Sequence, residues 1–348
     1  MFGRMMNNFY YGKSGKGDFR KEDLPKNRLQ LFFAMLRVRF MGLCSLNVIS
    51  ALAFVPMGLV LGYAVLSLIT SLNVKSACDE ILLNAGFVLE GVMDESTLAL
   101  AAQTLLDAGK IQAEVNIALN LSGALQSMLL ITLALLVPCI AITGPVQVGM
   151  AYITRNWARD EHAFVWADFK DAVKQNWKQS LPVSVITGLI PLVVYTSWTY
   201  YEALAVQNSL FIVPQAIVCM AAILWCLALV YIYPLIVGYE AKLSLILKNA
   251  FMIAIARLPQ TVLCRLVTVI PAVIALLVGY FTPYAMYAML ILFAYYLIIG
   301  NALSRFVFAS VSNAAFDKLI NVHIEGAKVN RGMSEEDDWD DEDETLEN

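Results

Sequence analysis

The sequence has little charge and few of the residues that carry acid–base or metal chemistry. Only 15% of its 348 residues are charged and only two are histidine, whereas soluble domains are about 25% charged. His162 and His323 stand far apart, and no Ser-His-Asp order, HExxH, CxxC or glycine-rich nucleotide motif accompanies them. We therefore expect that the protein is not an enzyme and that it has no catalytic residue, metal site or cofactor.

Charge is missing above all from six long apolar runs. The chain is 59% hydrophobic, and the middle of each run contains no Asp, Glu or Lys. A helix needs about 20 mostly apolar residues to cross a bilayer, and backbone groups in lipid must hydrogen-bond within their own segment. The runs predict an all-α, polytopic bundle of six transmembrane helices, at residues 43–69, 121–143, 181–201, 210–237, 262–281 and 284–310.

Lysine and arginine alternate between the connectors. Nine of them lie in residues 1–42 and five in the connector after the second run, but none lies in the connectors after the third and fifth runs. Cytoplasmic loops carry the excess of basic residues in membrane proteins. Both termini are therefore predicted to be cytoplasmic, residues 72–120 to form an external loop, and residues 151–180 and 238–261 to form cytoplasmic loops.

The two ends of the chain differ in charge. Residues 1–42 are basic and aromatic, and residues 27–40 are predicted to form an interfacial helix at the inner leaflet; a plain extension of the first span is the alternative. Residues 312–348 form a predicted cytoplasmic tail, whose acidic end at 335–344 is expected to be disordered or to dock on a basic partner. Nucleic acid is not implied as a partner, because the two charged ends nearly cancel.

The two longer predicted cytoplasmic loops combine aromatic and basic residues. Phe169, Val173 and Trp177 stand at i, i+4 and i+8, which is one stripe of a helix. Such a helix is able to lie along the membrane or to present its stripe to another protein. The candidate partner-contact residues are Trp157, Trp166, Phe169, Lys170, Trp177, Lys178, Lys248 and Arg257.

The same two loops share a weak similarity. Residues 169–173 align with 247–251, and a Leu-Pro pair follows each, at 181–182 and 258–259. The pattern indicates an internal repeat of span, cytoplasmic helix and span. Chance similarity between two amphipathic helices explains it equally well.

Ionisable residues are absent from the middle of the spans. Arg265 and Arg305 lie near the predicted cytoplasmic ends of their spans and are expected to snorkel. This argues against a proton-coupled carrier. A path for a neutral solute stays open, with polar side chains available at Asn47, Gln147, Tyr195, Thr196, Tyr231 and Asn301.

Two stretches of sequence carry a family resemblance. The start MFGRMMNNFYYGKSGKGDFRKEDLPKNR and the later GPVQVGMAYITRNWARDEHAFVWADFKDAVKQNWKQS resemble the YesL-like family of bacterial integral membrane proteins. The resemblance implies a multi-pass protein of the bacterial plasma membrane that accompanies carbohydrate uptake. It implies no catalytic or binding residues, since no molecular activity is established for the family.

Two hypotheses follow. The first is an accessory, non-enzymatic membrane protein associated with carbohydrate uptake, whose cytoplasmic amphipathic loops bind a partner such as the subunits of a sugar ABC transporter. The alternative is an autonomous transporter or channel for a small neutral solute. In both cases the lipid bilayer is the surrounding medium.

Overall fold

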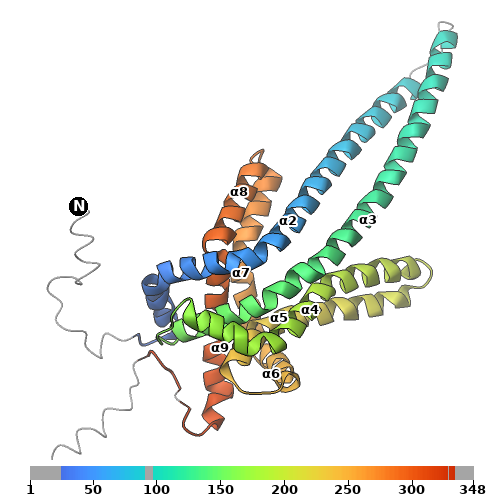
Figure 1. Ribbon diagram of the computed structural model, residues 1–348. Coiled ribbons are helices and arrows are strands. Elements are labelled where there is room, and N and C mark those ends of the chain that lie inside the picture. The colour runs from blue at the N-terminus through green and yellow to red at the C-terminus, as the bar shows by residue number, and fades with distance from the viewer. Residues whose placement is uncertain (1–24, 91–96, 328, 334–348) are drawn as a thin grey trace, which may run out of the picture. The chain divides into compact units, whose positions relative to one another are not determined.

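The computed structural model describes residues 25–90, 97–327 and 329–333. Those ranges contain helices and turns but no strand, so the predicted all-α class is confirmed. Residues 1–24 of the basic segment and the acidic stretch 335–344 lie outside the described residues. The main helices, labelled in Figure 1, are α2 (Arg28–Glu90), α3 (Thr97–Trp157), α4 (Ala167–Ala205), α5 (Ile212–Gly238), α6 (Leu243–Ala256), α7 (Leu258–Phe281), α8 (Ala285–Tyr295) and α9 (Asn301–Leu319).

Six helical stretches are long and apolar enough to cross a membrane, as predicted, and the chain is a multi-pass membrane protein. They are Arg28–Val65, Leu125–Trp157, Ala167–Ala205, Ser209–Gly238, Leu258–Phe281 and Ala285–His323. Most exceed the roughly 20 residues that a bilayer requires, because the helices continue into the polar sequence beside each apolar run. The last helix, α9, continues past residue 312 to Leu319, into the predicted cytoplasmic tail.

The predicted interfacial helix at residues 27–40 is the first part of α2 and is continuous with the first span. Figure 1 shows these first turns, in dark blue, running in a different direction from the turns that follow. The predicted external loop 72–120 is also largely helical. α2 continues to Glu90, and α3 begins at Thr97 and runs into the second span without a break.

The two predicted cytoplasmic loops differ in structure. In the first, α4 runs from Ala167 through Pro182 to Ala205 as one helix, continuous with the third span. The Asp168 carboxylate accepts a hydrogen bond from the backbone N–H of Phe164 at 2.8 Å, which caps the start of α4. In the second, α6 is separate and ends at Ala256, and the φ of -117° and ψ of 36° at Arg257 break the helix before α7.

The proposed repeat is therefore unequal in form. Leu181 and Pro182 lie inside α4, whereas Leu258 and Pro259 open α7. Proline suits the first turn of a helix, where its missing N–H has no partner to lose. The second copy uses that property to start a new helix, and the first copy does not.

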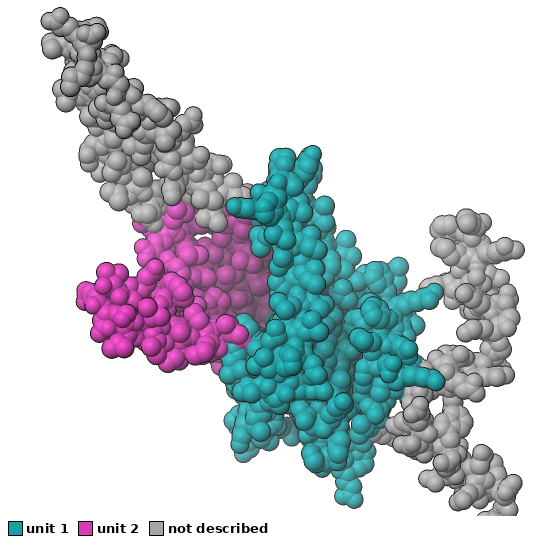
Figure 2. All heavy atoms as spheres, turned by 180° about the vertical axis from the view of Figure 1, so that it is seen from behind, with its two compact units in different colours: residues 1–50, 147–177, 224–348 teal, residues 51–146, 178–223 magenta. Residues whose placement is uncertain are grey.

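The chain divides into two compact units, coloured in Figure 2. Unit 1 comprises residues 1–50, 147–177 and 224–348, and unit 2 comprises residues 51–146 and 178–223. In unit 2, α3 and α4 approach closely at small residues, as membrane helices commonly do. Ser184 Oγ donates to the carbonyl of Ala141 at 2.8 Å, and a Cβ on Gly144 would lie 2.7 Å from the carbonyl oxygen of Ser180.

This contact predicts that Gly144→Ala destabilises the protein by about 2 kcal/mol, because a methyl group cannot fit against backbone without forcing the helices apart. Gly58→Ala is the matched control, since a Cβ at Gly58 meets nothing within 4 Å and alanine favours helix over glycine. Thermal unfolding of the detergent-solubilised proteins measures both. Equal stability of the two variants contradicts the proposed close approach.

Large side chains fill the core of unit 1. Trp157 at the end of α3 is 1% exposed, and Tyr231, Tyr233, Phe306 and Phe316 from α5 and α9 are fully buried. Gly42 on α2 makes room for the indole, since a Cβ there would lie 2.8 Å from the Trp157 ring. α2, α3, α5 and α9 thus contribute to one core.

A π-helical turn, η3 (Tyr296–Gly300), joins α8 to α9. Asn47 of α2 is fully buried beside it and makes two hydrogen bonds to the backbone of η3 and one to the backbone of α9. The Asn47 amide donates to the carbonyls of Tyr296 at 2.9 Å and Leu297 at 2.7 Å, and its oxygen accepts from the N–H of Ala302 at 2.9 Å. A π-turn disturbs the regular hydrogen bonds of a helix, and Asn47 supplies the missing partners.

Candidate functional site

Two of the predicted contact residues are buried. Trp157 is 1% exposed and Phe169 is 8% exposed. The Phe169 ring packs on Gly149 of α3, where a Cβ would lie 2.6 Å from it. Neither side chain is available to a partner in this structure, so the predicted contact set is corrected at both positions.

The exposed side of α4 is rotated by one residue from the predicted stripe. Phe169 and Val173 turn toward α3, while Trp166, Lys170 and Lys174, also four residues apart, are exposed. Trp177 is exposed as well, at 45%, and Trp166 reaches 62%. We call Trp166, Lys170, Lys174 and Trp177 the α4 face; Lys178, exposed on the next turn, belongs to unit 2.

The remaining predicted residues, Lys248 and Arg257, lie on and after α6. The buried side chains of this helix, which belongs to unit 1, are Ile246, Ala250, Ile253 and Ala254. Lys248 is exposed and Arg257 is half-buried. The outer side of α6 also exposes Leu245, Met252 and Ile255. An apolar outer side with one lysine suits a helix that lies at the level of the lipid headgroups.

A buried polar network lies at the ends of α2 and α9 and was not predicted from the sequence. The Asp317 carboxylate, 2% exposed, forms an ion pair with Arg28. It also accepts hydrogen bonds from the Asn321 side chain at 2.6 Å and from the N–H of Asn330 at 3.2 Å. Arg28 donates in addition to Asn330 at 2.8 Å. The network holds the first turn of α2 to the end of α9 and to the chain that follows.

Tyr239, just after α5, extends the network. Its hydroxyl donates to the Asn321 side-chain oxygen at 2.7 Å. Burial raises the pKa of the Tyr239 phenol, an effect that nearby Arg155 opposes, so the hydroxyl remains a donor at neutral pH. A second ion-pair group lies at the α3–α4 loop, where Glu161 pairs with Arg331 and lies 3.7 Å from Arg159.

Most of the polar residues predicted to line a solute path form internal hydrogen bonds instead. Asn47 binds the π-turn, the Gln147 oxygen accepts from Arg305, and the Tyr231 and Thr261 hydroxyls are 2.7 Å apart. Asn301 donates weakly to the carbonyl of Tyr296 at 3.4 Å, and Thr196 donates to its own helix at Leu192. Their side chains satisfy the protein's own polar groups.

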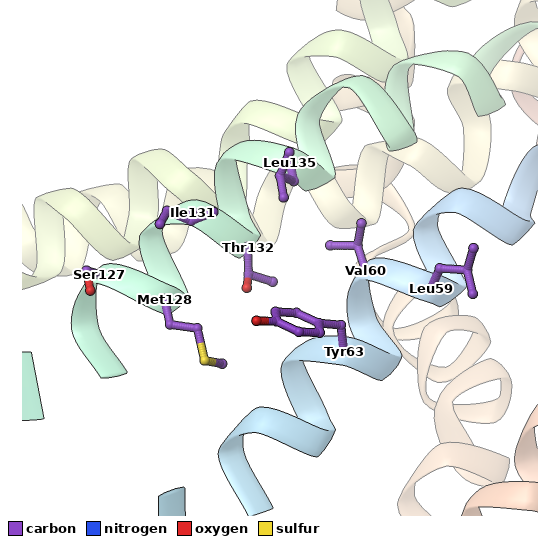
Figure 3. Close-up of a pocket in the computed structure, with 8 residues that line it drawn as sticks. All are labelled: Leu59, Val60, Tyr63, Ser127, Met128, Ile131, Thr132 and Leu135. Carbon is purple, nitrogen blue, oxygen red and sulfur yellow. The ribbon is translucent and has the colours of Figure 1, made fainter. Parts of the chain in front are cut away.

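Unit 2 contains an open cavity of about 560 Å³ between α2 and α3. Figure 3 shows Tyr63 of α2 pointing toward the side chains of α3. Apolar side chains dominate the walls and three hydroxyls interrupt them; the lining residues are Leu59, Val60, Tyr63, Ser127, Met128, Ile131, Thr132 and Leu135. No charged group lines it, so it suits an apolar or neutral occupant.

Comparison with known protein families gives a match. Residues 124–198 match the model of a family described as a protein of unknown function, DUF624, which is a family of membrane proteins. The matched segment contains the α3–α4 loop and the whole α4 face. No curated protein and no solved structure matches the chain.

Proposed function

We propose that this chain is an accessory, non-enzymatic protein of the bacterial plasma membrane that binds a partner protein through the α4 face, with both termini in the cytoplasm. The observation that carries the proposal is the exposure of two tryptophans beside two lysines at the start of α4, where Trp166 lies in the turn just before the helix. Tryptophan is the side chain most enriched at binding hot spots. The Trp166 side chain is 62% exposed, which leaves a large apolar area uncovered.

The chemistry of the α4 face favours an acidic, aromatic-accepting partner. Lys170 and Lys174 supply positive charge, and the tryptophans supply apolar contact area. The YesL-like resemblance of the same segment supports a carbohydrate-uptake setting, and it makes the membrane or ATPase subunits of a sugar ABC transporter the partners to test first. The DUF624 match covers this segment and assigns it no activity.

The test replaces Trp166 and Trp177 by alanine and Lys170 by glutamate in a tagged chain purified from native membranes in mild detergent. Transporter subunits should accompany the wild type in near-stoichiometric amount and fall about tenfold or more with the triple variant, since each hot-spot side chain contributes about 2 kcal/mol. Quantitative mass spectrometry measures the ratio. Sugar uptake by the cells should fall in parallel.

The control removes two aromatic residues that are even more exposed but lie on a different helix. Tyr280→Ala with Phe281→Ala changes two exposed rings at the end of α7 and should leave partner recovery unchanged. Recovery of the wild-type chain alone, or a complex that the triple variant retains in full, contradicts the proposal.

The alternative is an autonomous transporter or channel for a small neutral solute. The uncharged cavity between α2 and α3 favours it, whereas the internal use of the polar side chains weighs against a continuous path. Liposomes that contain only this protein decide between the two functions. Flux of a neutral solute into them supports the alternative, and the absence of flux across a wide sugar panel rejects it.

A further inference from the structure

Two arginines inside the membrane-spanning helices both lie against one aromatic ring, that of Phe308. Arg265 of α7 places its guanidinium carbon 4.7 Å from the centre of the Phe308 ring, and Arg305 of α9 places its own at 5.5 Å. Arg305 also lies 4.8 Å from the ring of Tyr233. The two charged groups can be no further apart than the sum of their distances to Phe308.

Neither charge is balanced within the described part of the chain. The ion pairs found there join Arg28 to Asp317 and Glu161 to Arg159 and Arg331. Arg265 and Arg305 donate only to neutral acceptors, the carbonyl of Cys226 and the side chain of Gln147. One further nitrogen on each, Nε of Arg265 and Nη1 of Arg305, is buried and has no hydrogen-bond partner among the described residues.

The aromatic contacts do not offset the cost of placing two unbalanced charges inside the spans. A guanidinium does not lose its proton in a protein, and a charged side chain within a span costs at least about 2.5 kcal/mol. Each cation–π contact returns about 0.5–2 kcal/mol, and two like charges repel at this distance. A bound anion removes the repulsion, satisfies the unpartnered nitrogens and accounts for the pair.

Phosphate is the anion that fits best. The planar fork of a guanidinium group matches the oxygens of a phosphate, which it binds with two parallel hydrogen bonds. Both arginines are half-buried, so part of each side chain stays accessible. Arg265 lies seven residues after the first residue of α7, about 10 Å along the helix, and its neighbours Leu263 and Leu266 are exposed and apolar, as at a lipid-facing surface.

We propose that Arg265 and Arg305 bind a phosphate group in unit 1, between α7 and α9, beside the Phe308 ring. Phospholipid headgroups and soluble phosphate compounds both supply this chemistry. The site is independent of the α4 face and of the partner proposed there.

The test uses the full chain in phosphate-free detergent buffer with two probes, phosphatidylglycerol and inorganic phosphate. Native mass spectrometry measures retained lipid, and thermal unfolding measures stabilisation by either probe. The wild type should bind at least one probe. Its apparent affinity should fall about tenfold or more in R265Q and in R305Q, since each loses a charge-assisted hydrogen bond. The double variant R265K/R305K keeps both charges but loses the planar forks, so its apparent affinity should lie between that of the glutamine variants and that of the wild type.

R37Q is the matched control, because Arg37 is an exposed arginine on α2, and its affinity should equal that of the wild type. Binding of phosphatidylglycerol alone identifies a lipid site, and binding of inorganic phosphate identifies a site for soluble phosphate compounds. The proposal is overturned if the wild type binds neither probe, or if folded R265Q and R305Q bind as tightly as the wild type.

Discussion

Replacing Asp317 by alanine is expected to lower the free energy of unfolding by about 3 kcal/mol or more. The carboxylate is 2% exposed and receives three donors, from Arg28, Asn321 and the backbone of Asn330. Its removal leaves a partly buried guanidinium without its counter-charge and two donors without an acceptor. Equilibrium unfolding in mixed detergent micelles with increasing SDS measures the loss.

Further variants at Asp317 and Arg28 separate the contribution of charge from that of hydrogen bonding. Asp317→Asn keeps one oxygen acceptor and should cost less than Asp317→Ala, whereas Arg28→Ala together with Asp317→Ala should cost less than the two single changes added. Arg331→Ala is the surface control, because its ion pair with Glu161 is 41% exposed on the arginine side and such pairs contribute about 0–1 kcal/mol. A cost at Asp317 as small as that at Arg331 rules out the network as a structural anchor.

The class of fold was predictable because its signal is local. Each span is one continuous apolar run, and a bilayer leaves the backbone of such a run few alternatives to helix. The helices exceed the predicted limits for the same reason, since polar residues next to a run are good helix formers once the helix has begun. Hydropathy marks where the apolar residues end and carries no signal for the end of the helix.

The inward side of α4 was not predictable from α4 alone. Phe169, Val173 and Trp177 form a regular stripe, but so do Trp166, Lys170 and Lys174. The choice between them depends on Gly149 of α3, whose missing side chain admits the Phe169 ring. Trp157 is buried for a similar reason, opposite Gly42 on α2. Glycines on other helices decide which aromatic residues pack inside.

The polar network and the π-turn join residues that are distant in sequence. Arg28 and Asp317 are 289 positions apart, and Asn47 and Ala302 are 255 apart. Neither pair has a periodicity or a motif of its own. A single asparagine in an apolar run is the one available signal, since a polar group within a span needs a partner, but the sequence does not say where that partner lies.

Replacing Asn47 by leucine is expected to lower the free energy of unfolding by about 3 kcal/mol or more. The carbonyl of Leu297 and the N–H of Ala302 lose the Asn47 side chain as a partner, and the carbonyl of Tyr296 keeps only the weak 3.4 Å bond from Asn301 outside its own helix. Each buried group left unsatisfied costs about 1–3 kcal/mol. Water cannot replace the amide, because Asn47 is fully buried. SDS unfolding measures the total, and hydrogen exchange of peptides covering 296–302 measures the local loss.

Ser50→Ala is the control for Asn47, since Ser50 is equally buried one turn further along α2 but bonds only to carbonyls of its own helix, Leu46 and Asn47. Its cost should stay below about 1 kcal/mol, because those carbonyls keep their helical partners. Faster exchange at 296–302 in Asn47→Leu but not in Ser50→Ala assigns the effect to the π-turn. Unchanged exchange in both shows that the turn forms without Asn47.

The π-turn also determines which way α9 faces. One extra residue in a helix rotates everything after it by about 100°. Arg305 and Asp317 both follow η3 on α9. A regular α-helical connection would therefore turn Arg305 away from Arg265 of α7, and Asp317 away from Arg28 of α2. If Asn47 holds the π-turn, Asn47→Leu should therefore weaken phosphate-probe binding and reduce the cost of a further Asp317→Ala change. Full additivity of Asn47→Leu with Asp317→Ala would instead show that the two sites fold independently.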